Sequence, residues 1–418
     1  MKATRREVLA LAAIGALGAR PASAETASQP HEGPAASHQA DFDQVWELVR
    51  DRFYDRRLNG LDWPEQRLRF RPDAASARSQ EEAAVVINAM LAKLGASHTH
   101  YYTPEDPAYY QLADIFVFAL EHRGLERVFP KGEVSYPGIG VFTEADNQGR
   151  RFVTGVIEGA PAHAAGVLLG DEIMSADARP FLPVGSFRGK VGSPVSLEIR
   201  RASGAAPIAI SVSPADLRPN EMFLRGLKES ARVIATDKAR IGYVHVWSYA
   251  SHRMQSALED LMSDGPLKDA DALVWDLRGG WGGAQPQYLD LFNPRAPTMK
   301  ITGRNGETGF VGVKWRKPVA ALINEGTRSG KEVLAYGFKE YRLGELVGHR
   351  TEGAVLAATA FLIGDDGLLL LAVEDVLVDG QRLEGVGVTP TIEVPFDSRY
   401  AAGGDPQLNR AIQVLARA

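Results

Sequence analysis

A serine lies where a predicted strand meets a predicted helix. Ser329 falls in E-G-T-R-S-G (325–330), after the apolar run P-V-A-A-L-I-N (318–324) and before a helix expected over 331–341. Flanking glycines permit a tight turn, and amides at a helix N-terminus favour developing negative charge. The hydroxyl in this position could be a nucleophile. The segment alone favours the plainer role of an N-cap serine.

A glycine-rich loop follows a second apolar strand. The run D-A-L-V-W-D-L (271–277) is nearly all apolar, as in a buried strand, and continues into R-G-G-W-G-G (278–283). Its glycines let backbone amides approach a ligand closely, so the loop could supply an N–H donor to an oxyanion. A phosphate-binding loop is disfavoured because G-x-x-x-x-G-K-[ST] is missing, whereas a plain turn stays open.

A serine nucleophile needs a base, and the chain has nine histidines. His98 follows Ser97 just beyond a helix predicted over 79–93, where a side chain can point into a cleft. Taken alone, such a histidine is more often structural. Glu384, in L-E-G-V-G-V-T-P (383–390), is by itself only a loop carboxylate.

Three kinds of segment must position these side chains. Apolar residues at helical spacing from Phe42 to Phe53 predict an N-terminal helical region. Residues 136–213 have short strands and turns, with one short helix near 160–165. From about residue 234 strands and helices alternate, which indicates an α/β layout.

Composition excludes several classes of function. The chain has 418 residues, a formal net charge of −5 and no cysteine. Its length predicts two or three domains, and the charge offers no basic field for nucleic acid. Without cysteine there are no disulfides, thiol nucleophiles or thiolate metal sites. No metal cluster is evident, so no metal and no cofactor is expected.

The first 24 residues resemble an export signal. Lys2, Arg5 and Arg6 precede a short apolar stretch (8–17), and Ala22-Ser23-Ala24 fits a cleavage site. The two arginines are typical of a twin-arginine signal, which predicts a periplasmic or secreted protein. Residues 25–40 are interpreted as a linker, and no membrane span is expected in the mature chain.

These motifs together resemble the C-terminal-processing (tail-specific) proteases and the related tricorn-type serine peptidases. The segment L-G-A-S-H-T (94–99) is similar to the family's L-G-D-S-H-T, and D-L-R-G-G-W-G-G (276–283) to its D-L-R-G-N-x-G-G. G-A-P-A-H-A-A-G-V-L-L-G-D-E-I (159–173) resembles part of its inserted PDZ domain.

The resemblance implies an α/β crotonase-like catalytic core with an N-terminal helical domain and an inserted β-rich PDZ-like domain. The implied boundaries are 41–125 for the helical domain, 131–214 for the PDZ-like domain and 225–418 for the catalytic domain. In the PDZ-like domain, Gly138, Ile139, Gly140 and Val141 correspond to the loop that binds a peptide carboxylate. The implied partner is a peptide or protein C-terminus, and the oligomeric state is left open.

The family has two catalytic forms, and the sequence departs from one of them. Tail-specific proteases pair their serine with a lysine in V-G-E-x-T-x-G-K-G, whereas V-G-H-R-T-E-G-A-V (347–355) places Ala354 at that lysine. Lys331 is a poor substitute for it, because residues two apart on a helix do not face each other.

The tricorn-type members use a histidine instead of the lysine. Their pattern implies Ser329 as nucleophile, His98 as base, and Glu384 with Ser97 orienting the imidazole. The amides of Gly330 and Gly282, with Gly283 as the nearby alternative, are the implied oxyanion donors. Ala96 replaces the family's aspartate, His349 is a second candidate base, and Gln381 or Glu374 replaces Glu384 if the last loops align differently.

The sequence therefore predicts an exported serine peptidase with a Ser-His-Ser-Glu site, acting on unstructured protein C-termini or peptides. The alternative is an inactive family member that binds peptides through its PDZ-like domain or binds a small ligand, because fold alone does not decide function. The joint presence of Ser329, His98 and Glu384 favours the enzyme.

Overall fold

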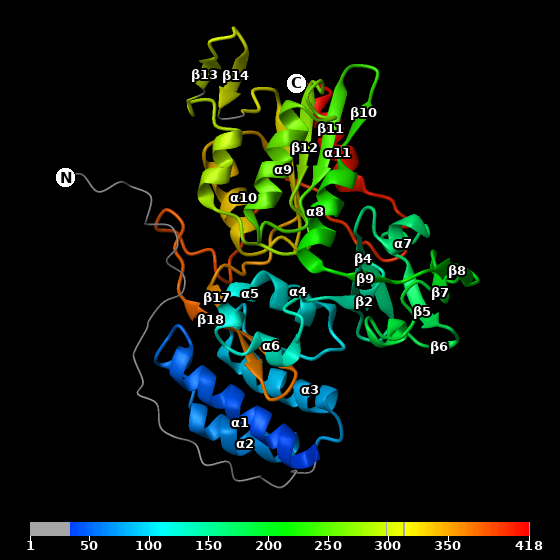
Figure 1. The fold of residues 1–418 in the computed structure, drawn as a ribbon, viewed down its shortest axis with the longest axis vertical. Coiled ribbons are helices and arrows are strands. Elements are labelled where there is room, and N and C mark those ends of the chain that lie inside the picture. The colour runs from blue at the N-terminus through cyan, green and yellow to red at the C-terminus, as the bar shows by residue number, and fades with distance from the viewer. Residues whose placement is uncertain (1–33, 298, 312–313, 418) are drawn as a thin grey trace, which may run out of the picture.

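The computed structural model describes residues 34–297, 299–311 and 314–417. The predicted export signal, residues 1–24, lies outside this range. Figure 1 shows helices from the N-terminal part at one end of the molecule, an α/β region at the other and a β-rich module at the side. No helix among the described residues is both long and apolar enough to cross a membrane.

The N-terminal helices pack through the apolar face that the sequence predicts. Side chains from Phe42 to Phe53 at the predicted spacing are buried, and the rings of Trp46 and Trp63 stack with centroids 6.4 Å apart. The prediction of a linker over 25–40 is wrong for residues 34–40, which form the first turns of a helix that starts at Pro34. Alanine is a strong helix former and proline suits the first helical position. The elements are α1 (Pro34–Arg52), η1 (Leu58–Gly60), α2 (Trp63–Ala75), α3 (Gln80–Leu91), η2 (Ala92–Leu94), α4 (Pro107–Ile115), α5 (Val117–Glu121) and α6 (Leu125–Val128).

A three-stranded antiparallel sheet joins this helical region to the C-terminal part of the chain. Its order is β1 (His100–Tyr102), β18 (Gly367–Glu374), β17 (Ala357–Ile363). The central strand is buried on both faces. Leu369 packs with the N-terminal helices, and Leu370 packs with the α/β core on the other face. The strand β1 follows Ser97 and His98 directly, so the sheet anchors that segment to the core.

The β-rich module has its own apolar core and an antiparallel sheet of order β3-β4-β5-β7-β8, with β6 paired to β5. Its first and last strands, β2 and β9, pair with each other, so the module continues past the predicted end at residue 214. The elements are β2 (Tyr136–Gly138), β3 (Val141–Ala145), β4 (Arg151–Val156), α7 (Pro161–Ala164), β5 (Glu172–Ala176), β6 (Arg179–Pro180), η3 (Gly185–Phe187), β7 (Val195–Arg200), β8 (Ile208–Val212) and β9 (Ala215–Leu217).

The α/β region is built on a sheet of order β10-β11-β12-β15-β16-β19, parallel apart from β10. Apolar residues of α8, α9 and α10 share a core with one face of this sheet, and α11 covers the other face. The helix α8 starts before the predicted boundary at 225. The elements are α8 (Pro219–Ser230), β10 (Arg232–Ala235), β11 (Arg240–His245), α9 (His252–Ser263), β12 (Ala272–Asp276), η4 (Pro286–Leu291), β13 (Met299–Thr302), β14 (Thr308–Val311), β15 (Val319–Ile323), α10 (Gly330–Glu340), β16 (Glu345–Gly348), β19 (Ile392–Glu393) and α11 (Pro406–Leu415).

The parallel sheet explains why the two glycine-containing segments meet. β12 and β15 are adjacent and parallel, with Asp276 paired to Leu322. The loop 278–283 and the segment 324–330 follow the carboxyl ends of these two strands and emerge at the same edge. Ligand sites of open α/β sheets lie at this edge.

Candidate active site

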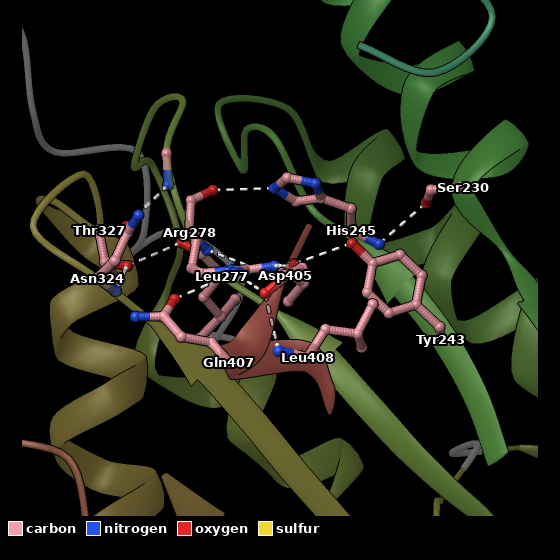
Figure 2. A network of polar contacts seen from close by, with 12 residues as sticks. Ser230, Tyr243, His245, Leu277, Arg278, Asn324, Thr327, Asp405, Gln407 and Leu408 are labelled. Carbon is pink, nitrogen blue, oxygen red and sulfur yellow. Dashed lines mark hydrogen bonds and ion pairs between the residues drawn. The ribbon is translucent and has the colours of Figure 1, made fainter. Parts of the chain in front are cut away.

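A buried arginine fixes the glycine-rich loop to the core, as Figure 2 shows. Arg278 begins the loop and donates hydrogen bonds to Asp276 Oδ2 on β12 and to Asp405 Oδ2 at the start of α11, both at 2.6 Å. Burial alone raises the pKa of Asp276, but the guanidinium of Arg278 holds it well below its usual range. Asp276 therefore binds Arg278 in its ionised form.

The same network connects the loop to the segment that precedes Ser329 (Figure 2). Thr327 Oγ1 donates to the carbonyl of Leu277 at 3.1 Å. The amide of Gly279 donates to Asn324 Oδ1 at 3.3 Å. These bonds fix the glycine-rich loop relative to the turn that carries the candidate nucleophile.

Ser329 occupies a strained turn at the N-cap of α10. Its backbone has φ 57° and ψ −134°, a combination that non-glycine residues rarely adopt. Such a conformation costs on the order of 1–3 kcal/mol and persists only where the surroundings impose it. The Ser329 amide donates to the carbonyl of Ala354 at 2.8 Å and to Glu332 Oε2 at 3.3 Å. The strain fits a residue held for chemistry better than one that only caps a helix.

Two glycines meet at Ser329, one from each loop. A Cβ added to Gly282 would lie 2.5 Å from Ser329 Cβ, 2.8 Å from the Gly330 amide nitrogen and 2.9 Å from Ser329 Oγ. Only glycine allows this approach. The predicted oxyanion donors Gly282 and Gly330 therefore lie beside the candidate nucleophile, as the sequence predicts. Gly283, the alternative, has φ 88° and lies against the backbone of Ala250.

The other predicted residues form one hydrogen-bonded chain. Ser97 Oγ is 2.9 Å from Glu384 Oε2 and 3.0 Å from His98 Nδ1. The Ser97 amide donates to Glu384 Oε1, and the amide of Val355 donates to Glu384 Oε2 at 2.8 Å. Glu384 thus connects the N-terminal segment to the backbone just after Ala354. Ala354 is itself bonded to Ser329.

The donors in this chain determine which imidazole nitrogen carries a proton. An ionised carboxylate only accepts, so the Ser97 hydroxyl donates its one proton to Glu384. Ser97 Oγ can then only accept from His98, which places the hydrogen on Nδ1. Nε2 keeps its lone pair, the state that a general base requires. His98 also has a positive φ, 50°, and is the second predicted catalytic residue in a strained conformation.

Burial keeps His98 neutral. Desolvation, assisted by the charge of Arg328, lowers the pKa of His98 to about 4, and Glu384 opposes the shift. His98 and Ala354 line a cavity of about 260 Å³ together with Trp281, Arg328 and Glu352. Among the described residues the Ser329 hydroxyl makes no hydrogen bond with His98. Ser329 is not among the residues that line this cavity; its chain neighbour Arg328 and its backbone hydrogen-bond partner Ala354 are. The structure therefore does not join the two halves of the site.

The alternative residues lie elsewhere or make other contacts. His349 is exposed and its Nδ1 contacts Glu393 Oε1. Glu374 and Gln381 are exposed, whereas Glu384 holds Ser97. Position 354, which aligns with the lysine of the tail-specific proteases, holds an alanine. Lys331 is fully buried and its Nζ contacts backbone carbonyls, a placement that helical spacing did not predict.

The predicted peptide-binding loop bends tightly into the β-rich module. Gly138 ends β2 and Val141 begins β3. Ile139 is buried, and its carbonyl accepts the Ala162 amide at 2.8 Å. Gly140 has φ 76°, and a side chain there would collide with Ala160. These residues are held close to α7.

Sequence reasoning missed Trp281, Arg328 and Glu352, which also line the cavity. Arg328 and Glu352 form an ion pair at 2.8 Å, and the Arg328 guanidinium lies 5.5 Å from the centroid of the Trp281 ring. Burial raises the pKa of Glu352, and Arg328 lowers it. Arg328 directly precedes Ser329, which was the only available signal. The described residues contain no group of acidic or histidine side chains that could hold a metal.

The family follows from comparison with known proteins. Residues 240–394 match the model of peptidase family S41, and residues 34–92 match the tricorn protease C1 domain. The first match covers the loop 278–283, Ser329 and Glu384, and both matches lie in the expected order. Over residues 240–394 the chain is similar to peptidase family S41.

Two groups of known proteins are similar to the chain. The chain is 26% identical to tricorn protease homolog 1 of Streptomyces coelicolor, over 92% of this chain and 36% of the relative. It is 27% identical to the carboxy-terminal processing protease CtpA of Bacillus subtilis, over 62% of this chain and 56% of the relative. The crystal structure of the tricorn protease shares the fold, with a TM-score of 0.53 and 19% identity over 92% of this chain and 37% of that chain. The chain thus spans about a third of the tricorn-type proteins.

Proposed function

We propose that the chain is an exported serine peptidase that hydrolyses peptide bonds in protein C-termini or peptides, with Ser329, His98, Ser97 and Glu384 as its catalytic residues. The observation that carries this proposal is the hydrogen-bonded chain from Glu384 through Ser97 to His98 Nδ1. That arrangement leaves Nε2 free to accept a proton. A binding protein has no need of an imidazole oriented in this way.

The proposed reaction uses the two halves of the site in turn. Ser329 Oγ attacks the scissile carbonyl carbon while His98 Nε2 takes the hydroxyl proton. The charge that develops on the carbonyl oxygen is met by the amides of Gly330 and Gly282, each worth about 3 kcal/mol in comparable sites. His98 then gives its proton to the leaving amine, and water completes hydrolysis of the acyl-enzyme through the same base.

The surrounding regions have supporting roles in this proposal. The α/β region serves as a crotonase-like catalytic core, and the β-rich module serves as a PDZ-like domain. In the latter, the loop Gly138–Val141 receives the terminal carboxylate of the substrate, because backbone nests can capture such groups. Processing of C-termini is named for relatives such as CtpA, which supports this substrate class. Export rests on the N-terminal pattern of residues 1–24.

Labelling with a fluorophosphonate probe tests the nucleophile and the base together. The wild type should be labelled, Ser329→Ala should not, and His98→Ala should be labelled at least 100-fold more slowly. Two matched controls should retain wild-type labelling. Ser251→Ala changes another helix N-cap serine, and His349→Ala changes an exposed histidine.

The outcomes separate the enzyme from the binding protein. Equal labelling of wild type and Ser329→Ala would refute Ser329 as the nucleophile. A wild type that stays unlabelled while binding C-terminal peptides would favour the inactive PDZ-like alternative.

A further inference from the structure

A buried lysine, Lys331, lies next to the two segments that carry the proposed oxyanion donors. Lys331 is the second residue after Ser329 and is 0% exposed. Its Nζ is 2.8 Å from the carbonyl oxygen of Gly279 and 3.2 Å from that of Trp247. Both hydrogen bonds connect α10 to other segments of the chain.

The two carbonyls belong to the structure that holds the glycine-rich loop. The carbonyl of Trp247 also accepts the Trp281 amide at 2.8 Å, and the Tyr249 amide donates to the carbonyl of Gly282 at 2.8 Å. The loop 278–283 is thus bonded along the segment 247–249. Lys331 donates hydrogen bonds to both segments, 247–249 and 278–283, and connects them to the helix that begins at Gly330.

Stability alone does not explain a lysine at this position. Within the described residues no carboxylate lies within ion-pair distance of Nζ, so the ammonium is solvated by carbonyl dipoles only. Burial lowers the pKa of Lys331 to about 7; Asp276 opposes this shift and Arg328 adds to it. An unbranched apolar side chain such as methionine would fill similar space without that desolvation cost. The burial of an ammonium therefore calls for a role beyond packing.

We propose that Lys331 is the positioning residue that sets Gly282 and Gly330 at the spacing needed to bind one oxyanion. The two amides come from different segments, the loop 278–283 and α10. Lys331 bonds both segments across their interface. This inference rests on the proposed peptidase function and adds a residue to it.

The first test replaces the ammonium by an apolar group. In Lys331→Met, kcat for a chromogenic ester or peptide should fall about 10- to 100-fold, less than the 10²- to 10³-fold that follows loss of an oxyanion donor. KM should change less than threefold, because the ground-state carbonyl gains little from the donors. Thermal unfolding should occur within a few degrees of the wild type. The matched control is Lys339→Met on the same helix, whose exposed lysine binds the carbonyl of Thr389 at 3.0 Å. It should leave kcat unchanged.

The second test is the pH dependence of kcat. The charged groups that act on Lys331 are Asp276 on β12 and Arg328 before α10. Asp276 in turn interacts with Arg278 in the loop and with His245, whose Nδ1 lies 3.9 Å from Glu158 Oε1. Deprotonation of Lys331 weakens its two hydrogen bonds, so kcat of the wild type should fall as pH rises through about 7. This decrease of kcat at basic pH should be absent in Lys331→Met. In Lys331→Arg it should move to higher pH, because a guanidinium stays charged.

The third test does not depend on activity. Hydrogen–deuterium exchange of the peptide that covers 278–283 should quicken in Lys331→Met and stay unchanged in Lys339→Met. Wild-type kcat in a folded Lys331→Met, or unchanged exchange in this loop, would overturn the inference. If Lys331→Met does not fold, Lys331→Arg becomes the deciding variant. A loss of kcat in Lys331→Arg, without a shift of the basic-side decrease to higher pH, would contradict the inference. An unlabelled wild type would instead overturn the proposed function and leave the exchange result to decide the role of Lys331.

Discussion

At the residue scale, the protonation of His98 decides when the site can act. A general base must be neutral, and burial together with Arg328 lowers the pKa of His98 to about 4. We expect kcat/KM to be lost on the acidic side only as pH falls through about 4. This acidic limb of the pH profile lies at lower pH than the ordinary pKa of histidine, near 6.5.

Removal of Arg328 should move this acidic limb. In Arg328→Gln the positive charge that disfavours imidazolium is gone, so the pKa of His98 should rise and the limb should shift to higher pH. Glu384→Gln should shift it to lower pH, because a charge that favours imidazolium is lost. Arg382→Gln, which breaks the exposed pair with Asp375, is the control and should leave the limb in place. The kcat/KM profiles from pH 3 to 8 provide the measurement, and coincident limbs in all variants would contradict the assignment of His98.

At the element scale, the ion network of Arg278 holds β12, the glycine-rich loop and α11 together. Arg278→Met leaves the fully buried Asp276 without its partner, which should cost about 3–5 kcal/mol in the free energy of unfolding. Arg399→Met breaks an exposed pair with Asp397 and should cost less than about 1 kcal/mol. Urea unfolding of the three proteins at pH 7 gives the comparison.

Acid should reduce the difference between wild type and Arg278→Met. The pKa of Asp276 is lowered in the folded state, so its contribution to stability is complete above its ordinary pKa, about 4, and is lost as pH falls toward the folded value. The free-energy difference between the two proteins should therefore shrink below about pH 4. A difference that stays constant from pH 7 to pH 3 would show that Asp276 is not the group concerned.

At the scale of the whole molecule, the β-rich module contacts the α/β region through Trp247. The Trp247 ring stacks on Phe142 of β3 with centroids 5.4 Å apart, and its Nε1 donates to Glu158 at 2.7 Å. The Trp247 backbone carbonyl is the one that Trp281 and Lys331 bind. The module thus borders the residue that anchors the glycine-rich loop 278–283.

Excision of residues 136–217 should therefore lower the rate of hydrolysis itself, in addition to altering substrate choice. It would expose Trp247 and loosen the loop, so hydrolysis of a small ester should fall at least tenfold together with peptide hydrolysis. A shortened β13–β14 hairpin, with residues 303–307 replaced by a two-residue turn, is a matched excision at an exposed site and should retain ester hydrolysis. A folded, excised protein with wild-type ester hydrolysis would show that the module acts only on substrate binding.

Local sequence patterns predicted most elements of the fold. The helix around Phe42 follows from apolar periodicity, and the strands before residues 278 and 324 follow from continuous apolar runs. Both are short-range properties. The same reasoning failed at residues 34–40, because an alanine-rich stretch satisfies both a linker composition and a helix. Nothing local predicted that the C-terminal strand β18 would pair with β1, since strand pairing across such a separation depends on the whole core.

The sequence by itself determined which groups were available: a serine between glycines, a Ser-His pair, a carboxylate near the C-terminus, and no lysine at position 354. Their roles came from a family pattern, because side chains as far apart in the chain as those of His98 and Ser329, 231 positions, carry no signal in their spacing. Only the tertiary structure joined Ser97, His98 and Glu384, brought Gly282 against Ser329, and buried Lys331 between two loops. Hydrogen bonds and desolvation act over a few ångströms, and only folding creates those distances.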